Sequence, residues 1–118
     1  MDLLTLSNTE RLLAYLAAYA CKDIAALGAM LADDVTLRDW TLAVRGKAAA
    51  IAETAKNFGA AGSLEIEPLG IYADGDTVAA ELKITIDGHT DLRVVDVVSF
   101  DKDGHIRSIR AYLGRPEV

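Results

Sequence analysis

Residues 77–100 read TVAAELKITIDGHTDLRVVDVVSF, and this stretch decides the fold class. Apolar and polar residues alternate on both sides of Asp87-Gly88, a pair that is typical of tight turns. Pro68 and Gly70, in an earlier alternating segment, predict a bulge that bends the sheet. Because the turns are too short for a crossover helix, we expect an antiparallel meander. Its strands are predicted over 64–73, 77–87, 90–100 and 105–113.

Helical patterns occupy the N-terminal half of the chain. Ser7 and Glu10 have the spacing of a capping box, and apolar residues then recur at helical period as far as about residue 22. Asp23 can cap a short second helix over 24–31, and the alanine-rich stretch 47–58 predicts a third. Residues 35–40 alternate as a strand does. We therefore expect a single α+β domain over 1–118, with three N-terminal helices packed on a curved antiparallel sheet.

The composition is that of a globular protein, since 52% of the 118 residues are hydrophobic and 25% are charged. A net charge of −6 with scattered Lys and Arg argues against nucleic acid or an anionic membrane as a partner. No apolar run reaches the roughly 18 residues of a membrane span, and the opening stretch is too short for a signal peptide. We therefore expect a cytoplasmic protein.

The metal-binding residue types are few and scattered. The single cysteine, Cys21, cannot form an internal disulfide, and we expect it to be a buried free thiol. His89 and His105 lie too far from it and from each other in the sequence to suggest a shared metal. We therefore expect neither a metal ion nor an organic cofactor.

Three polar residues stand where the pattern calls for apolar ones. Along 90–100, Asp96 alternates in phase with Val94 and Val98, so it points into an apolar face. Along 35–40 the same logic places Asp39 on the inner face. On the first helix, Tyr15 lies in the middle of the apolar stripe. Each residue alone is more often a satisfied core or turn residue, but three of them on elements that pack together indicate a site.

These residues also resemble those of a known family. The matching runs are YLAAYACKD over 15–23, LADD over 31–34, Asp39, Val95-Asp96 and SIRA over 108–111. They resemble ketosteroid isomerase, within the nuclear-transport-factor-2-like (SnoaL-like) superfamily. The resemblance implies a cystatin-like cone, in which the helices cover one face of the curved sheet.

The resemblance also implies roles for the three residues. In the family a tyrosine and a neutral aspartic acid donate hydrogen bonds to an enolate oxygen, and a second aspartate moves the proton. By motif position these roles fall on Tyr15, Asp96 and Asp39. The implied activity is that of an isomerase or polyketide cyclase acting on a small apolar carbonyl compound. A non-catalytic ligand-binding or accessory domain remains the main alternative, followed by dehydration or epoxide hydrolysis.

Several further residues are candidates for the lining of the pocket. Trp40 stands where the isomerases usually carry proline, and it predicts a pocket smaller than a steroid requires. The aromatic and apolar candidates are Tyr19, Trp40, Phe58, Val94, Val98 and Tyr112.

The opposite face of the sheet predicts a partner. Val95 and Val97 alternate out of phase with Asp96 and point away from the helices. An apolar outer face usually finds cover, and the family commonly forms dimers. We therefore expect a homodimer through the outer sheet face.

Overall fold

The computed structural model describes residues 5–115, which form three helices and one six-stranded sheet. The helices are α1 (Asn8–Ala20), α2 (Ile24–Met30) and α3 (Lys47–Ala60). The strands are β1 (Leu31–Arg38), β2 (Ala43–Arg45), β3 (Leu64–Asp74), β4 (Thr77–Ile86), β5 (Thr90–Phe100) and β6 (Ile106–Leu113).

The first two helices begin where the sequence places their caps. The Ser7 hydroxyl accepts from the Glu10 amide at 3.1 Å, and the Glu10 carboxylate accepts from the Ser7 amide at 2.9 Å. Both donors would otherwise lack partners, because the first turn of a helix leaves its N–H groups unpaired. Asp23 caps α2 by accepting from the Ala26 amide at 3.0 Å. The predicted capping box and second cap are therefore confirmed.

The strands follow the order β2-β1-β6-β5-β4-β3 across the sheet. The meander β3-β4-β5-β6 is antiparallel as predicted, and the register shift between Pro68 and Gly70 is the predicted bulge. The sheet as a whole is mixed, which corrects the expectation of an antiparallel sheet, because β1 runs parallel to β6. The short β2, which was not predicted, pairs with β1. The β1–β6 pairing joins segments that are distant in the sequence, and the β1–β2 pairing joins segments on either side of a turn.

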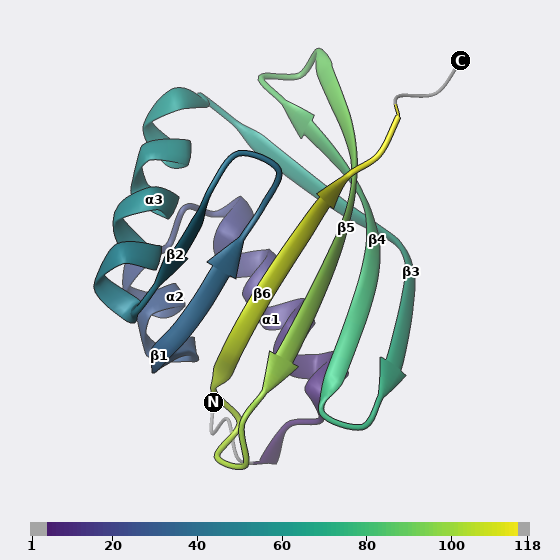
Figure 1. The fold of residues 1–118 in the computed structure, drawn as a ribbon. Helices are drawn as coiled ribbons and strands as arrows, with labels where there is room; N and C mark the ends of the chain where they lie inside the picture. Colours follow the sequence, from purple (N-terminus) through teal and green to yellow (C-terminus); the bar gives the residue numbers. More distant parts are fainter. Residues whose placement is uncertain (1–4, 116–118) are drawn as a thin grey trace.

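The helices lie on one face of the curved sheet, with α1 behind the central strands and α3 beside β1 (Figure 1). The core between these layers contains side chains with almost no exposed surface, among them Leu12, Leu27, Leu82, Phe100 and Ile106. Alternation along β4 and β5 therefore has its predicted effect, with one side of each strand in the core and the other facing outward. Among the described residues, no helix is long and apolar enough to span a membrane.

Three sequence-based expectations need correction. The strand expected to begin at residue 35 begins at Leu31, directly after the second helix, so Asp33 and Asp34 lie within β1. The strand expected over 35–40 ends at Arg38, so Asp39 lies in a turn. Cys21 is exposed rather than buried, because it is the C-cap of α1 and lies outside the apolar stripe.

Candidate functional site

A pocket of about 350 Å³ opens between α1, α3 and the inner face of the sheet. Its apolar wall includes Ile66 of β3, Ile84 of β4, and Leu92 and Val94 of β5. This volume lies near the lower end of the range for small-molecule sites, which are typically apolar with a few placed polar groups. The polar residues in the lining are Tyr15, Tyr19, Asp39, Thr41, Thr54, Asn57 and Asp96.

Tyr15 projects from α1 into the deep part of this pocket, and only 7% of its surface is exposed. Its hydroxyl has no hydrogen-bond partner within residues 5–115. Every side-chain N or O atom in that range that is fully buried does have a partner, so this hydroxyl is not fully buried. The hydroxyl therefore opens onto the pocket. Burial raises the pKa of Tyr15 well above its ordinary value, and the charge of Asp96 raises it further. Tyr15 is thus a neutral donor at physiological pH.

Asp96 occupies the centre of β5, where its neighbours across the sheet are Ala80 and Ala111. Directly paired side chains share a face, so two small residues flank the carboxyl and leave it room. Burial raises the pKa of Asp96 to about 7, because an apolar surrounding disfavours the charged form. Near neutral pH a large share of Asp96 is therefore protonated and able to donate a hydrogen bond.

Asp39 reaches the pocket from the turn between β1 and β2. Its Oδ1 accepts from the Thr41 amide at 2.8 Å, the Thr41 hydroxyl at 2.9 Å and the Leu42 amide at 3.0 Å. Such a turn orients the side chain through its own backbone. Because all three donors use Oδ1, the second carboxylate oxygen remains available to a ligand.

The sequence argument missed Asn57, which lies on α3 and lines the pocket. Its side-chain amide donates to the Tyr19 hydroxyl at 3.2 Å. Tyr19 packs its ring edge-on against Phe58, with ring centroids 4.9 Å apart. Asn57 is an exposed polar residue on a helix, so its sequence position offered no signal of this role.

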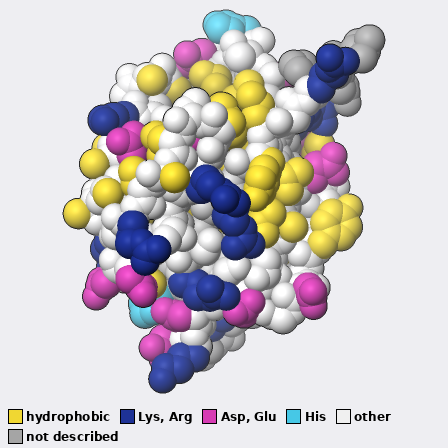
Figure 2. Space-filling view, in the orientation of Figure 1, with side chains coloured by type: hydrophobic (Ala, Val, Ile, Leu, Met, Phe, Trp, Pro, Cys, Tyr) yellow, Lys and Arg dark blue, Asp and Glu magenta, His cyan; other side chains and the backbone are white. Residues whose placement is uncertain are grey.

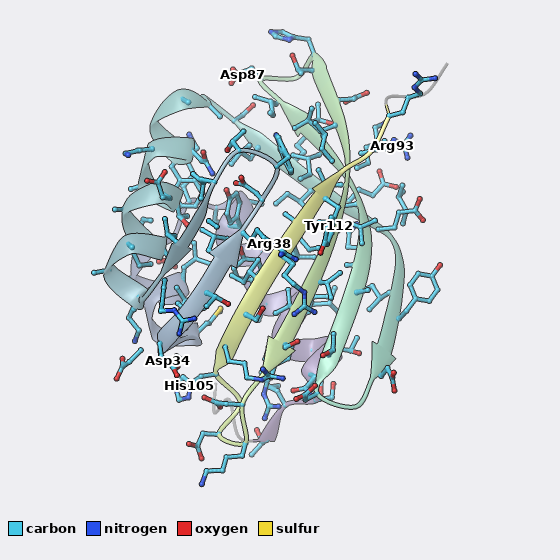
Figure 3. All side chains as sticks on the ribbon, viewed as in Figure 1. Asp34, Arg38, Asp87, Arg93, His105 and Tyr112 are labelled. Atoms are coloured by element: carbon cyan, nitrogen blue, oxygen red, sulfur yellow. The ribbon has the colours of Figure 1, made fainter. Side chains whose placement is uncertain are left out.

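The six candidate lining residues divide into three groups. Tyr19, Trp40 and Val94 lie in the lining of the pocket. Phe58 and Val98 are buried in the core behind it. Tyr112 lies on the outer sheet face, where its hydroxyl accepts from the Arg38 guanidinium at 2.9 Å (Figure 3). A register shift at the β5–β6 pairing reverses the alternation along β6 and accounts for this error.

Two side chains fix the rim of the pocket near the end of α3. The Lys22 ammonium donates to the carbonyl oxygens of Phe58, Ala61 and Gly62, where a cation complements the helix C-terminus. Asp87 accepts from the amides of Gly62 at 2.6 Å and Ser63 at 2.9 Å, and these bonds lower the pKa of its carboxyl. Ala60 and Ala61 therefore hold a defined position in the lining.

The polar groups of this pocket can donate hydrogen bonds and can accept or release protons. The lining offers two carboxyl groups and two phenols in an apolar wall. Within residues 5–115, no group of three or more His, Cys, Asp or Glu side chains could hold a metal ion. An apolar pocket with one oriented carboxylate, two neutral phenols and a protonated carboxyl suits a ligand that gains negative charge on an oxygen.

Comparison with known proteins identifies a matching domain family. Residues 12–109 match the SnoaL-like domain family. No curated protein gave a significant match.

Solved structures share the fold at low sequence identity. A proposed ketosteroid isomerase from Kribbella flavida DSM 17836 superposes with a TM-score of 0.82 at 17% identity, covering 94% of this chain and 80% of that chain. A proposed polyketide cyclase from Sinorhizobium meliloti gives 0.79 at 21%, with coverage of 94% and 99%. An LEH-like epoxide hydrolase from M. tuberculosis gives 0.77 at 24%, with coverage of 91% and 82%. At these identities the likeness concerns the fold alone.

Proposed function

The chain belongs to the SnoaL-like domain family, and we propose that it is an enzyme that moves a proton on the carbon next to a carbonyl group. Its ligand is a small, largely apolar carbonyl compound, and the reaction is of the isomerase or cyclase type. One observation carries this proposal. The Tyr15 hydroxyl and the Asp96 carboxyl, both without hydrogen-bond partners in the described chain, line the same apolar pocket as the oriented Asp39.

Each residue then has a distinct role. The free oxygen of Asp39 takes the proton as the C–H bond breaks, and the electron pair moves onto the carbonyl oxygen. Tyr15 and protonated Asp96 donate hydrogen bonds to that oxygen as it becomes an enolate. Asp39 then returns the proton to another carbon or to the original one. The apolar wall strengthens both hydrogen bonds, because water does not compete there.

A second reading is a domain that binds such a ligand without turnover. The observation that favours it is the position of Asn57, which supports Tyr19 rather than Tyr15. Without a supporting partner, the hydroxyl of Tyr15 is held only by the packing of its ring. Binding and turnover are distinguishable because only turnover moves a proton.

The test is the ultraviolet absorbance of a conjugated enone formed from a β,γ-unsaturated ketone. A small cyclic ketone and a steroidal ketone are compared with the wild-type protein. We expect turnover of the small ketone and little of the steroidal one, because the pocket is about 350 Å³ and Trp40 stands in its lining. Absence of turnover with both ketones, together with measurable binding, would favour the non-catalytic reading.

We further propose that two copies of the chain pack through the outer sheet face. Three arginines on neighbouring strands of this face, Arg38, Arg45 and Arg110, form no ion pair with described residues. Figure 2 looks onto this face and shows dark-blue side chains beside yellow ones.

The β3–β4 side of the same face carries an excess of acidic residues, with the basic Lys83 and Arg93 among them. Glu65 and Glu67 on β3 and Glu81 on β4 also form no ion pair with described residues. Between the two ends lie Val95, which is 37% exposed, and its neighbour Tyr112, which is 49% exposed. A two-fold axis that runs parallel to the strands through this apolar middle would place the basic end of each copy on the acidic end of the other.

This interface predicts a dimer that dissociates when the charges at one end are reversed. Mixing two variants with opposite reversals should restore a dimer. Arg38→Glu/Arg110→Glu makes the face acidic at both ends, and Glu67→Arg/Glu81→Arg makes it basic at both ends. In sedimentation velocity at micromolar concentration, we expect each variant alone to be monomeric and their mixture to be dimeric. Lys56→Glu/Lys102→Glu, with its changes on α3 and in the β5–β6 turn, should remain dimeric. A monomeric wild-type protein, or a mixture that stays monomeric, would contradict the interface.

A further inference from the structure

The turn between β1 and β2 holds the proposed base with a side-chain donor as well as with its backbone. The Asp39 amide donates to the Leu42 carbonyl oxygen at 3.0 Å. The amides of Thr41 and Leu42 donate to Asp39 Oδ1 at 2.8 and 3.0 Å, and the Thr41 hydroxyl donates to the same oxygen at 2.9 Å. Three bonds with backbone donors therefore close this turn, and the Thr41 hydroxyl makes a fourth.

A second turn of the chain is closed without such a hydroxyl. Asp101, between β5 and β6, accepts from the amides of Asp103 at 2.9 Å and His105 at 3.0 Å. Its own amide donates to the His105 carbonyl oxygen at 2.8 Å. No hydroxyl group of the described residues donates to this carboxylate. Closing a turn of this kind therefore needs only backbone donors, and the Thr41 hydroxyl adds a constraint that turn formation does not explain.

The additional bond restricts the direction of the Asp39 carboxylate. The torsion that rotates a carboxylate about its Cβ–Cγ bond has a broad energy profile, so donors on one oxygen leave some freedom to the other. Thr41 is exposed and lines the pocket, so water can compete for Asp39 Oδ1 at this place. A third protein donor on Oδ1 narrows the torsion and fixes the direction of Oδ2. A proton acceptor needs a fixed direction, because a misplacement of about 1 Å can cost a large factor in rate.

We propose that Thr41 is a positioning residue, whose hydroxyl holds the Asp39 carboxylate so that Oδ2 faces the carbon from which the proton leaves. This inference rests on the proposed proton transfer and goes beyond it, because it assigns a role to a residue that neither gains nor loses a proton. The proton moves from carbon to Asp39 Oδ2 and back to carbon, while the Thr41 hydroxyl keeps its own. The branched side chain of threonine suits this role, because its restricted χ1 torsion limits the directions of the hydroxyl.

The inference is tested with cyclohex-3-enone, a small β,γ-unsaturated ketone whose conversion to cyclohex-2-enone gives the ultraviolet signal of a conjugated enone. Thr41→Val keeps the shape of the side chain and removes the hydroxyl. We expect kcat to fall about tenfold and KM to change less than about twofold, because the lost bond orients the base and the substrate keeps its contacts. Thr41→Ser restores the hydroxyl and should keep kcat within about threefold of the wild type.

Trp40 distinguishes a displaced turn from a rotated carboxylate. It is the single tryptophan of the chain, it lies between Asp39 and Thr41, and it lines the pocket. Its fluorescence therefore reports both the conformation of the turn and the binding of a ligand. In Thr41→Val without ligand we expect the emission spectrum of the wild type, because the three bonds with backbone donors remain.

Thr85→Val is the matched control. The Thr85 hydroxyl also donates to an aspartate, Asp91 Oδ1, at 2.9 Å, and neither residue lines the pocket. The variant therefore removes the same kind of bond at a distance from the proposed chemistry, and it should keep the kcat and KM of the wild type.

The outcomes separate this inference from the proposed function. If the wild type converts the ketone and Thr41→Val keeps its kcat within about twofold, the positioning role is overturned and the proton transfer stands. A loss that Thr41→Ser does not restore, a change confined to KM, or a loss with a shifted Trp40 spectrum would overturn it as well. Absence of conversion by the wild type would overturn the proton transfer and the role of Thr41 with it.

A fall in kcat that Thr41→Ser restores, with an unchanged Trp40 spectrum and wild-type values in Thr85→Val, supports the inference. If Thr41→Val does not fold, Thr41→Ala removes the same hydroxyl and is assessed by the same criteria.

Discussion

Asp39→Asn is expected to lower kcat/KM for enone formation by about 10² to 10⁴-fold, the usual contribution of a general base. Asparagine keeps a carbonyl oxygen that can accept from Thr41 and Leu42, as Asp39 Oδ1 does now. Its NH2 group replaces the free carboxylate oxygen and cannot take a proton at neutral pH. The loss should therefore fall on the chemical step with the turn intact, and the ultraviolet assay measures it directly.

The matched control is Asp34→Asn, which makes the same change at an exposed position on β1. It should retain wild-type kcat/KM, and both variants should unfold thermally close to the wild type. A change of less than twofold in Asp39→Asn would remove Asp39 from the mechanism.

Asp96→Asn is expected to be more favourable for stability at alkaline pH than at acidic pH, when its free energy of unfolding is compared with that of the wild type. In the native state the pKa of Asp96 is about 7, against 3.8 for an ordinary aspartate. Between these values the native protein binds a proton that the unfolded chain releases, so wild-type stability falls as pH rises through this window. At 1.36 kcal/mol per pH unit, the loss amounts to about 4 kcal/mol at pH above 7.

The asparagine variant lacks this penalty because its amide does not ionise. Relative to the wild type, it should therefore gain about 4 kcal/mol in free energy of unfolding between about pH 4 and pH 8. Urea unfolding at both pH values measures this gain, and Asp34→Asn should show none. The same relative stability at both pH values would show that Asp96 is not held neutral.

Activity should respond to the same proton. Because only protonated Asp96 donates to the enolate oxygen, kcat/KM should fall as pH rises above about 7. In Asp96→Asn the amide donates at every pH, so this alkaline fall should disappear, and the rate should be lower than that of the wild type below about pH 7.

Local features of the fold were predictable from the sequence because their causes are local. The Ser7 capping box, the Asp23 cap and the bounds of β5 follow from residues within a few positions. Asp96 was placed correctly because β5 alternates without a break up to that residue, and its pairing with Ala80 and Ala111 keeps it on the inner face.

Other features depend on contacts that the sequence does not encode locally. The parallel pairing of β1 with β6 joins the two halves of the chain. Tyr112 was misplaced because a single register shift reverses every later side chain on β6. Asp39 reaches the pocket from a turn, so the strand alternation that was used to place it does not account for its position. The Tyr19–Asn57 hydrogen bond joins two helices and had no sequence signal.

The most direct test of the account is hydrogen–deuterium exchange at the carbon next to the carbonyl of a small ketone, followed by proton NMR in D2O. Exchange requires proton abstraction and replacement of the proton on Asp39 by a deuteron from the solvent, and it does not depend on which product forms. The account predicts that the wild-type protein accelerates exchange and that Asp39→Asn does not. The ketone is used at concentrations at which the change in Trp40 fluorescence is complete. Exchange at the uncatalysed rate under these conditions, with the wild-type protein, would contradict the proposed proton transfer.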